Sequence, residues 1–180
     1  SGDVGVFSET YDTKIQGSNK VLTPTVISIL DATNASMIGN YSITYINNSS
    51  GVIEKRPITL TANTNTKVYD GTLSSTATPT LTGALGSGDV GVYSQTYDTK
   101  SQGINKKLTP TATILDATNA SMIGNYSITY TSVNTGVIEK RPITLTASTN
   151  TKVYDGTVSA TATPTITTGS LVSGDVGVFS

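Results

Sequence analysis

Carboxylates are the main candidates for catalytic or metal-binding chemistry here, because the 180 residues contain neither Cys nor His. Their absence excludes thiol nucleophiles, Ser-His-Asp triads, disulfides and the common zinc sites. Calcium needs about six to eight oxygen ligands, and no two acidic residues of the central region have EF-hand or Gly-Asp repeat spacing. We therefore expect these residues to form turns, and we predict no metal and no cofactor. They are Asp70, Asp89, Asp98, Asp116 and Glu139.

A Tyr-Asp-Gly triplet occurs twice, at Tyr69, Asp70 and Gly71 and again at Tyr154, Asp155 and Gly156. Tyrosine and aspartate often contact sugars, but Asp-Gly also favours a tight turn, and a tyrosine ring is readily buried while its hydroxyl finds a partner. We favour the structural interpretation. The spacing of the carboxylates alone leaves open a pair for glycoside hydrolysis. Because duplication of a whole active site almost unchanged along one chain would be unusual, we predict that the protein is not an enzyme.

Long stretches of the sequence recur almost unchanged. Residues 31–45 recur at 116–130, residues 51–62 at 136–147, and residues 64–72 at 149–157. These copies are 85 residues apart, and other recurring segments are 86 residues apart. This period is too long for one turn of a solenoid and suits a small autonomous domain. Two pseudo-symmetric halves of one core are the alternative, but such halves usually diverge to fit each other. We predict a window on a tandem array, with 1–55 the C-terminal part of one repeat, 56–140 a complete repeat and 141–180 the N-terminal part of the next.

The composition favours an all-β fold. Hydrophobic residues make up 36% of the chain and charged residues 13%, so Thr, Ser, Asn and Gly dominate the remainder. Such a composition suits short strands with polar outer faces better than long helices. We predict tandem β-sandwich (Ig-like) repeats, each with at most one short helical turn; β-grasp-like α+β repeats are the alternative.

Alternating apolar and polar residues locate several of the expected strands of the central repeat. We expect strands over 58–62, 67–69, 76–82, 90–97, 108–114, 126–130 and from 136 onward. Pro79 and Pro110 cannot donate to a strand ladder, so their segments should lie at sheet edges or bulges. Asp116 is a plausible N-cap for a helical turn over Asn119–Ile123. The five central tyrosines should be buried if they are structural: Tyr69, Tyr93, Tyr97, Tyr126 and Tyr130.

The two predicted repeat junctions carry the same charged, proline-bearing segment. A proline fixes its own φ and holds the preceding residue extended, and no Gly/Ser linker intervenes. We therefore expect a stiff joint rather than a flexible string of domains. The junction residues are Glu54, Lys55, Arg56 and Pro57, with their copies Glu139, Lys140, Arg141 and Pro142.

Four motifs together give the sequence a family resemblance. Arg56-Pro57-Ile58-Thr59-Leu60-Thr61 precedes Lys67-Val68-Tyr69-Asp70-Gly71-Thr72, and a Gly-Asp pair and a Gly-Asn-Tyr motif follow at Gly88, Asp89, Gly124, Asn125 and Tyr126. The full repeat thus resembles the YDG/MBG-type repeats of large bacterial surface proteins. The resemblance implies filamentous-haemagglutinin-like exoproteins and other adhesins in which such repeats form extracellular stalks. It implies no catalytic residues.

Two functional hypotheses follow from this resemblance and from the array. The first is a structural stalk or fibre at the bacterial cell surface, whose partners are the neighbouring repeats of the same chain, with lateral or head-to-tail self-association left open. The second is a multivalent module with one weak glycan- or protein-binding site per repeat, which would reach host or matrix ligands through avidity. A net charge of −1 argues against nucleic acid as a partner. No apolar run approaches the length of a membrane span.

Overall fold

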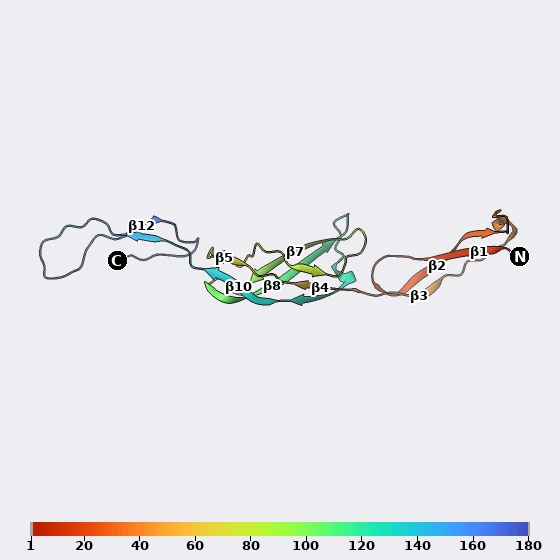
Figure 1. Cartoon of the computed structure of the whole chain (residues 1–180), viewed down its shortest axis with the longest axis horizontal. Coiled ribbons are helices and arrows are strands. Elements are labelled where there is room, and N and C mark those ends of the chain that lie inside the picture. The colour runs from red at the N-terminus through yellow and green to blue at the C-terminus, as the bar shows by residue number, and fades with distance from the viewer. Residues whose placement is uncertain (1, 180) are drawn as a thin grey trace. The chain divides into compact units, whose positions relative to one another are not determined.

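The computed structural model describes residues 2–179, and all of its longer regular elements are β-strands (Figure 1). Its helical elements are two single 3-10 turns, η1 (Ile38–Asn40) and η2 (Ile123–Asn125). The all-β prediction is therefore confirmed, and the described residues hold no helix of the kind that a β-grasp repeat needs. The Ig-like sandwich arrangement and the repeat boundaries remain predictions.

Contacts divide the chain into two compact units, each made of several segments. Unit 1 comprises residues 1–58, 85–90 and 114–127. Unit 2 comprises residues 59–84, 91–113 and 128–180. The predicted repeat boundary between residues 55 and 56 falls inside unit 1, and the boundary between residues 140 and 141 falls inside unit 2. Each boundary is thus enclosed by one set of mutually contacting segments.

Unit 1 contains a three-stranded antiparallel sheet in the order β1 (Val4–Tyr11), β2 (Gly17–Leu30) and β3 (Asn48–Ile53). The β1–β2 hairpin pairs Val4 with Leu30 and Tyr11 with Leu22, with a register shift at Val6 and Phe7. β3 pairs with the first part of β2, from Gly17 to Leu22. Gly51 of β3 is buried at the place where a Cβ would meet the ring of Tyr11 and the backbone of Lys20, so this pairing requires a residue without a side chain.

Two further sheets are built mainly from residues of unit 2. One has the order β5 (Thr66–Val68), β10 (Val133–Glu139), β8 (Gly103–Leu115) and β7 (Val90–Tyr97). Within it β10 runs parallel to β5 and antiparallel to β8. The other has the order β6 (Thr80–Thr82), β4 (Arg56–Thr61) and β9 (Tyr126–Thr131). A separate pair, β11 (Thr144–Thr146) and β12 (Thr165–Thr168), copies the β4–β6 hairpin.

A small apolar core lies in unit 2. Ala62, Tyr97, Leu108 and Ile138 are each at most 2% exposed and contact one another, with Tyr69 and Val133 packed against them. The buried hydroxyl of Tyr97 donates to both Asn65 oxygens at 2.8 Å, which satisfies the polar end of an otherwise apolar ring.

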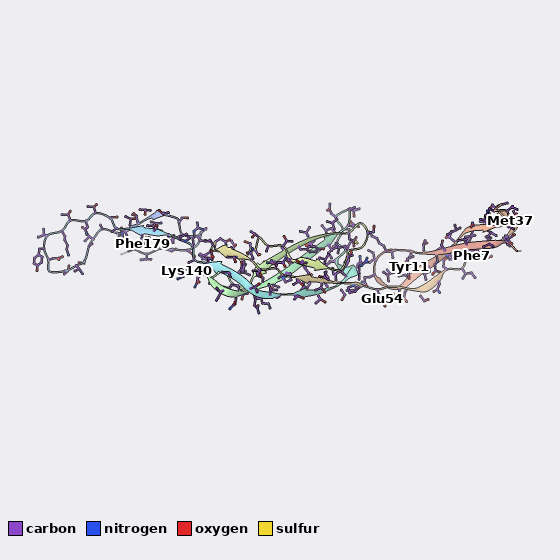
Figure 2. The ribbon with its side chains drawn as sticks, viewed as in Figure 1. Phe7, Tyr11, Met37, Glu54, Lys140 and Phe179 are labelled. Atoms are coloured by element: carbon purple, nitrogen blue, oxygen red, sulfur yellow. The ribbon has the colours of Figure 1, made fainter. Side chains whose placement is uncertain are left out.

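Equivalent residues differ in burial between the copies. Leu60 of β4 is 0% exposed, whereas Leu145 of β11 is 50% exposed. Tyr97 is 2% exposed, whereas its copy Tyr11, labelled in Figure 2 on the same strand as Phe7, is 45% exposed. Among residues 2–179 the buried hydrophobic residues other than Ile29 all lie between Ile58 and Ile138. The segments that cover these side chains therefore come together only around residues 56–140.

Some local predictions were wrong. The helical turn is Ile123–Asn125 rather than Asn119–Ile123, because Asn119 has a φ of 62° and cannot continue a right-handed turn. Asp116 does not cap that turn; its Oδ1 instead accepts the amides of Thr118 and Ala120 in a tight loop. The strand expected over 76–82 shortens to β6, and Pro79 stands just before it.

Pro110 lies inside β8, beyond Leu108, the last β8 residue that pairs with β10. The missing N–H of the proline therefore interrupts no β8–β10 pair.

The described residues contain no helix long and apolar enough to cross a membrane.

Candidate functional site

The Tyr-Asp-Gly triplet forms a turn that its own neighbours hold together. Oδ1 of Asp70 accepts the amide of Thr72 at 2.9 Å and the ammonium group of Lys67 at 2.8 Å. Nζ of Lys67 also donates to the carbonyl oxygen of Thr72 at 2.9 Å and lies 5.2 Å from the centre of the Tyr97 ring. Gly71 has a φ of 76°, which an L side chain would strain. The charged groups of the turn are thus bonded to one another.

The second triplet repeats this turn with the same bonds. Lys152 Nζ lies 2.9 Å from Asp155 Oδ1, which also accepts the amide of Thr157 at 3.0 Å, and Gly156 has a φ of 72°. Tyr154 is 92% exposed, whereas Tyr69 is half-buried. Because the turn is the same in both settings, the local sequence determines its geometry and the surrounding segments determine the position of the tyrosine.

The Gly-Asp pair and the Gly-Asn-Tyr motif meet through one hydrogen bond. The buried Tyr126 hydroxyl donates to Asp89 Oδ2 at 2.6 Å and accepts the amide of Gly86 at 2.7 Å. The equivalent pair in residues 1–55 makes the same bond, from the Tyr41 hydroxyl to Asp3 Oδ2 at 2.8 Å. Gly88 has a φ of 83° in the loop before Asp89, and Gly124 lies within η2. Both motifs are recognisable in the sequence, but their pairing is not.

In unit 1 a cavity of about 290 Å³ lies at the predicted boundary between residues 55 and 56. Asn125 Oδ1 accepts the backbone amide of Gln16 at 3.0 Å there, and Lys14 Nζ lies 3.9 Å from Asp116 Oδ2. Residues from both sides of the boundary line the cavity: Lys14, Gln16, Ile53, Glu54, Arg56, Gly86, Ser87, Asp89, Met122, Asn125 and Tyr126.

In unit 2 a cavity of about 420 Å³ lies at the boundary between residues 140 and 141. The Tyr69 hydroxyl donates to Asp175 Oδ1 at 3.2 Å, and Arg141 Nε donates to the carbonyl oxygen of Ser170 at 2.8 Å. Glu54 and Lys140 mark the two boundaries in Figure 2. The lining residues are Tyr69, Ser101, Gln102, Lys140, Arg141, Ile143, Ser170, Leu171, Val172 and Asp175.

The remaining junction residues are in extended or exposed positions. Arg56 and Pro57 begin β4, and Glu139 ends β10. Lys55 and Pro142 are exposed, and the Pro142 carbonyl closely approaches Gly169. Lys14, Gln16 and Asp175 also lie at the boundaries and were not predicted to do so. A signal was present, because a Thr-Lys-x-Gln-Gly motif recurs at residues 13–17 and 99–103.

Hydrogen bonds and burial shift several pKa values away from neutrality. The Lys67 ammonium group and the Thr72 amide hold the pKa of Asp70 at about 2. Hydrogen bonding to Asp175 raises the pKa of Tyr69, and hydrogen bonding to Asp3 raises that of Tyr41. Burial, followed by the Asp89 bond, raises the pKa of Tyr126. Each shift strengthens the ordinary charge state at pH 7, which suits structural hydrogen bonds better than proton transfer.

No group of three or more His, Cys, Asp or Glu residues suited to a metal occurs among residues 2–179. The described motifs form turns, tyrosine–carboxylate hydrogen bonds and contacts at the boundaries.

No curated protein and no solved structure matches the chain. A family model does match, over β4 to β9 and including the first Tyr-Asp-Gly turn, the Gly-Asp pair and the Gly-Asn-Tyr motif. Residues 54–133 are a YDG domain.

Proposed function

We propose that the chain is part of a structural stalk or fibre, in which YDG repeats follow one another in an array that extends from a bacterial cell surface. The observation that carries this proposal is the near-identity of stretches such as 31–45 and 116–130. Copies that each bound a different ligand would be under pressure to differ. Copies that supply length have no such pressure, and their number can change by recombination.

The boundaries support a stiff array. Each boundary lies within one compact unit, and hydrogen bonds connect segments on its two sides. A proline follows each boundary by one residue, which keeps the connecting segment extended. An array with such joints would hold a terminal binding domain away from the cell. In this proposal the protein acts outside the cell, is not an enzyme and has its neighbouring repeats as its principal partners, and lateral or head-to-tail association would make it a fibre.

A multivalent binding module is the second candidate, and one observation favours it. Tyr130 is 45% exposed and its copy Tyr45 is 50% exposed, so an accessible aromatic ring recurs with the repeat. Aromatic rings on a surface are frequent contact residues for proteins and sugars. Tyr97 and Tyr126 are buried and are excluded as contacts, whereas Tyr69 and Tyr93 are half-buried.

Two measurements separate the candidates. Cells carrying the parent protein with shortened arrays should attach less well as repeats are removed, while the isolated 180-residue chain should bind nothing on a broad array of glycans and matrix proteins. Binding by the isolated chain that is lost on Tyr130→Ala together with Tyr45→Ala would instead support the binding module. Attachment that is independent of array length would contradict the stalk.

A further inference from the structure

We propose that the YDG, Gly-Asp and Gly-Asn-Tyr motifs of successive repeats form a single inter-repeat joint, in which one aspartate accepts tyrosine hydroxyls from two repeats. This inference goes beyond the stalk function, because it concerns the contact between copies in any array of these repeats. The two cavities lie at equivalent boundaries, and each contains a different part of the contacts that form the joint.

The equivalence of the boundaries follows from the sequence copies. Gln16, Arg56 and Asp89 line the first cavity, and their copies Gln102, Arg141 and Asp175 line the second. In unit 1 the following repeat supplies Asn125, whose Oδ1 accepts the Gln16 amide of the preceding repeat at 3.0 Å. In unit 2 the preceding repeat supplies Tyr69, whose hydroxyl donates to Asp175 of the following repeat at 3.2 Å.

The Gly-Asp carboxylate has a separate oxygen for each tyrosine. Oδ2 accepts the Tyr41 hydroxyl at Asp3 and the Tyr126 hydroxyl at Asp89, so this oxygen serves the Gly-Asn-Tyr motif of the same repeat in both copies. Oδ1 of Asp175 accepts Tyr69 of the preceding repeat. An ionised carboxylate has about four lone-pair sites and can accept both bonds at once. In an intact array each Gly-Asp aspartate therefore connects the YDG tyrosine before it with its own Gly-Asn-Tyr tyrosine.

Gly71 adds a packing contact to the same joint. A Cβ at Gly71 would lie 2.5 Å from Cγ1 of Val172, whereas a Cβ at Gly156, its copy, would meet nothing within 4 Å. Both glycines have nearly the same positive φ, 76° and 72°. The turn requires a residue at Gly71 that tolerates a positive φ. The contact with Val172 of the following repeat additionally requires that this residue has no Cβ.

The Asn125 contact is tested by the mobility of the boundary in the full 180-residue chain. The chain has no Cys, so Thr10→Cys and Ser127→Cys would place two nitroxide labels at exposed strand positions on opposite sides of the boundary, both within unit 1. Electron–electron double resonance should give one narrow distance distribution. Asn125→Ala should lose that narrow peak, Asn125→Asp should retain it because an acceptor oxygen remains, and Asn40→Ala, the matched change in the preceding repeat, should leave it intact. An unchanged distribution in Asn125→Ala would overturn the proposal.

The Tyr69 contact is tested by tyrosine titration followed by NMR on the same chain. Each aspartate raises the pKa of one tyrosine. Asp175→Asn should therefore lower the pKa of Tyr69 and leave that of Tyr41 unchanged, whereas Asp3→Asn should lower the pKa of Tyr41 and leave that of Tyr69 unchanged. A Tyr69 pKa that does not respond to Asp175→Asn would also overturn the proposal. Both experiments use the isolated chain, so their failure would leave the dependence of cell attachment on array length as a separate test of the stalk.

Discussion

The Asp70 carboxylate is the clearest case of a single side chain with a perturbed pKa. Lys67 Nζ is 2.8 Å away, and the Lys67 side chain is only 12% exposed. Asp70, the Thr72 carbonyl and the face of Tyr97 therefore replace most of the water around the ammonium group. Asp70 itself is 43% exposed, which limits by solvent screening what the pair adds to stability. Its main effect is to fix the turn.

We predict that Asp70→Asn lowers the free energy of unfolding at pH 7 by about 1 kcal/mol or less, the usual range for a partly exposed ion pair. The folded-state pKa of about 2 lies below the ordinary value of about 3.9, so the carboxylate stabilises the fold above about pH 4. That contribution is lost as the pH falls from about 4 through about 2. In urea unfolding across this range, the free energies of unfolding of the unmodified chain and of Asp70→Asn should become equal at low pH. Asp155→Asn should have a smaller effect than Asp70→Asn at pH 7. A constant difference down to pH 2 would contradict the assignment.

Gln95 is a buried polar residue for which the sequence made no prediction. It is 1% exposed, its Oε1 accepts the Asn63 amide at 2.8 Å, and its Nε2 donates to the Asn63 carbonyl at 2.6 Å and to Ser75 Oγ at 3.0 Å. Gln95 lies two residues from both Tyr93 and Tyr97, so strand geometry places it on the same face as these tyrosines. Its hydrogen-bond partners come from the loop that follows β4 and from Ser75, and no local sequence pattern predicts that these segments lie beside it.

Gln95→Glu should destabilise the protein at pH 7 by about 1–3 kcal/mol, because a carboxylate cannot donate to Asn63 and would be buried with its charge. Burial raises the folded-state pKa of such a Glu above its unfolded value, so the penalty should shrink as the pH falls below about 5. Glu9 occupies the equivalent exposed position in the preceding repeat, and Glu9→Gln is the matched control. Thermal unfolding at pH 7 and pH 4.5 measures both. Equal effects of the two substitutions would show that burial is not the cause.

Strands show which parts of the fold the sequence can predict. Alternation predicted a strand over residues 108–114, which lies within β8, and Asp-Gly predicted the turn after β5. Burial could not be predicted this way, since β4 and β11 share the Thr-Leu-Thr sequence and differ fully in exposure. The motif residues Asp89 and Tyr126 were recognised singly, but their hydrogen bond depends on a sequence separation of 37 residues. Non-local contacts of this kind are the part that periodicity does not encode.

Leu60→Ala should therefore destabilise the chain by about 2–5 kcal/mol, the usual cost of truncating a fully buried leucine. Leu145→Ala makes the same change in the same local sequence, but Leu145 is 50% exposed, and its effect should be below about 1 kcal/mol. Urea unfolding of both variants provides the comparison. Similar losses would mean that β11 is covered to the same extent as β4.

At the scale of the whole molecule, the proposed stalk consists of repeats and the joints between them. A YDG domain occupies residues 54–133, and near-identical sequence continues on both sides of it. The hydrogen bonds of Gln16 with Asn125 and of Tyr69 with Asp175 lie at the two boundaries. Our central claim is that such joints make a tandem array stiff, which is the property that a stalk needs.

Small-angle X-ray scattering from arrays of increasing repeat number tests this claim most directly. Stiff joints predict that the largest dimension grows by a constant increment with each added repeat, about 35 Å if strands of about ten residues run along the array. Flexible joints would instead make the dimension grow roughly as the square root of the repeat number. A linear increase would support the stalk, and a square-root increase would contradict it.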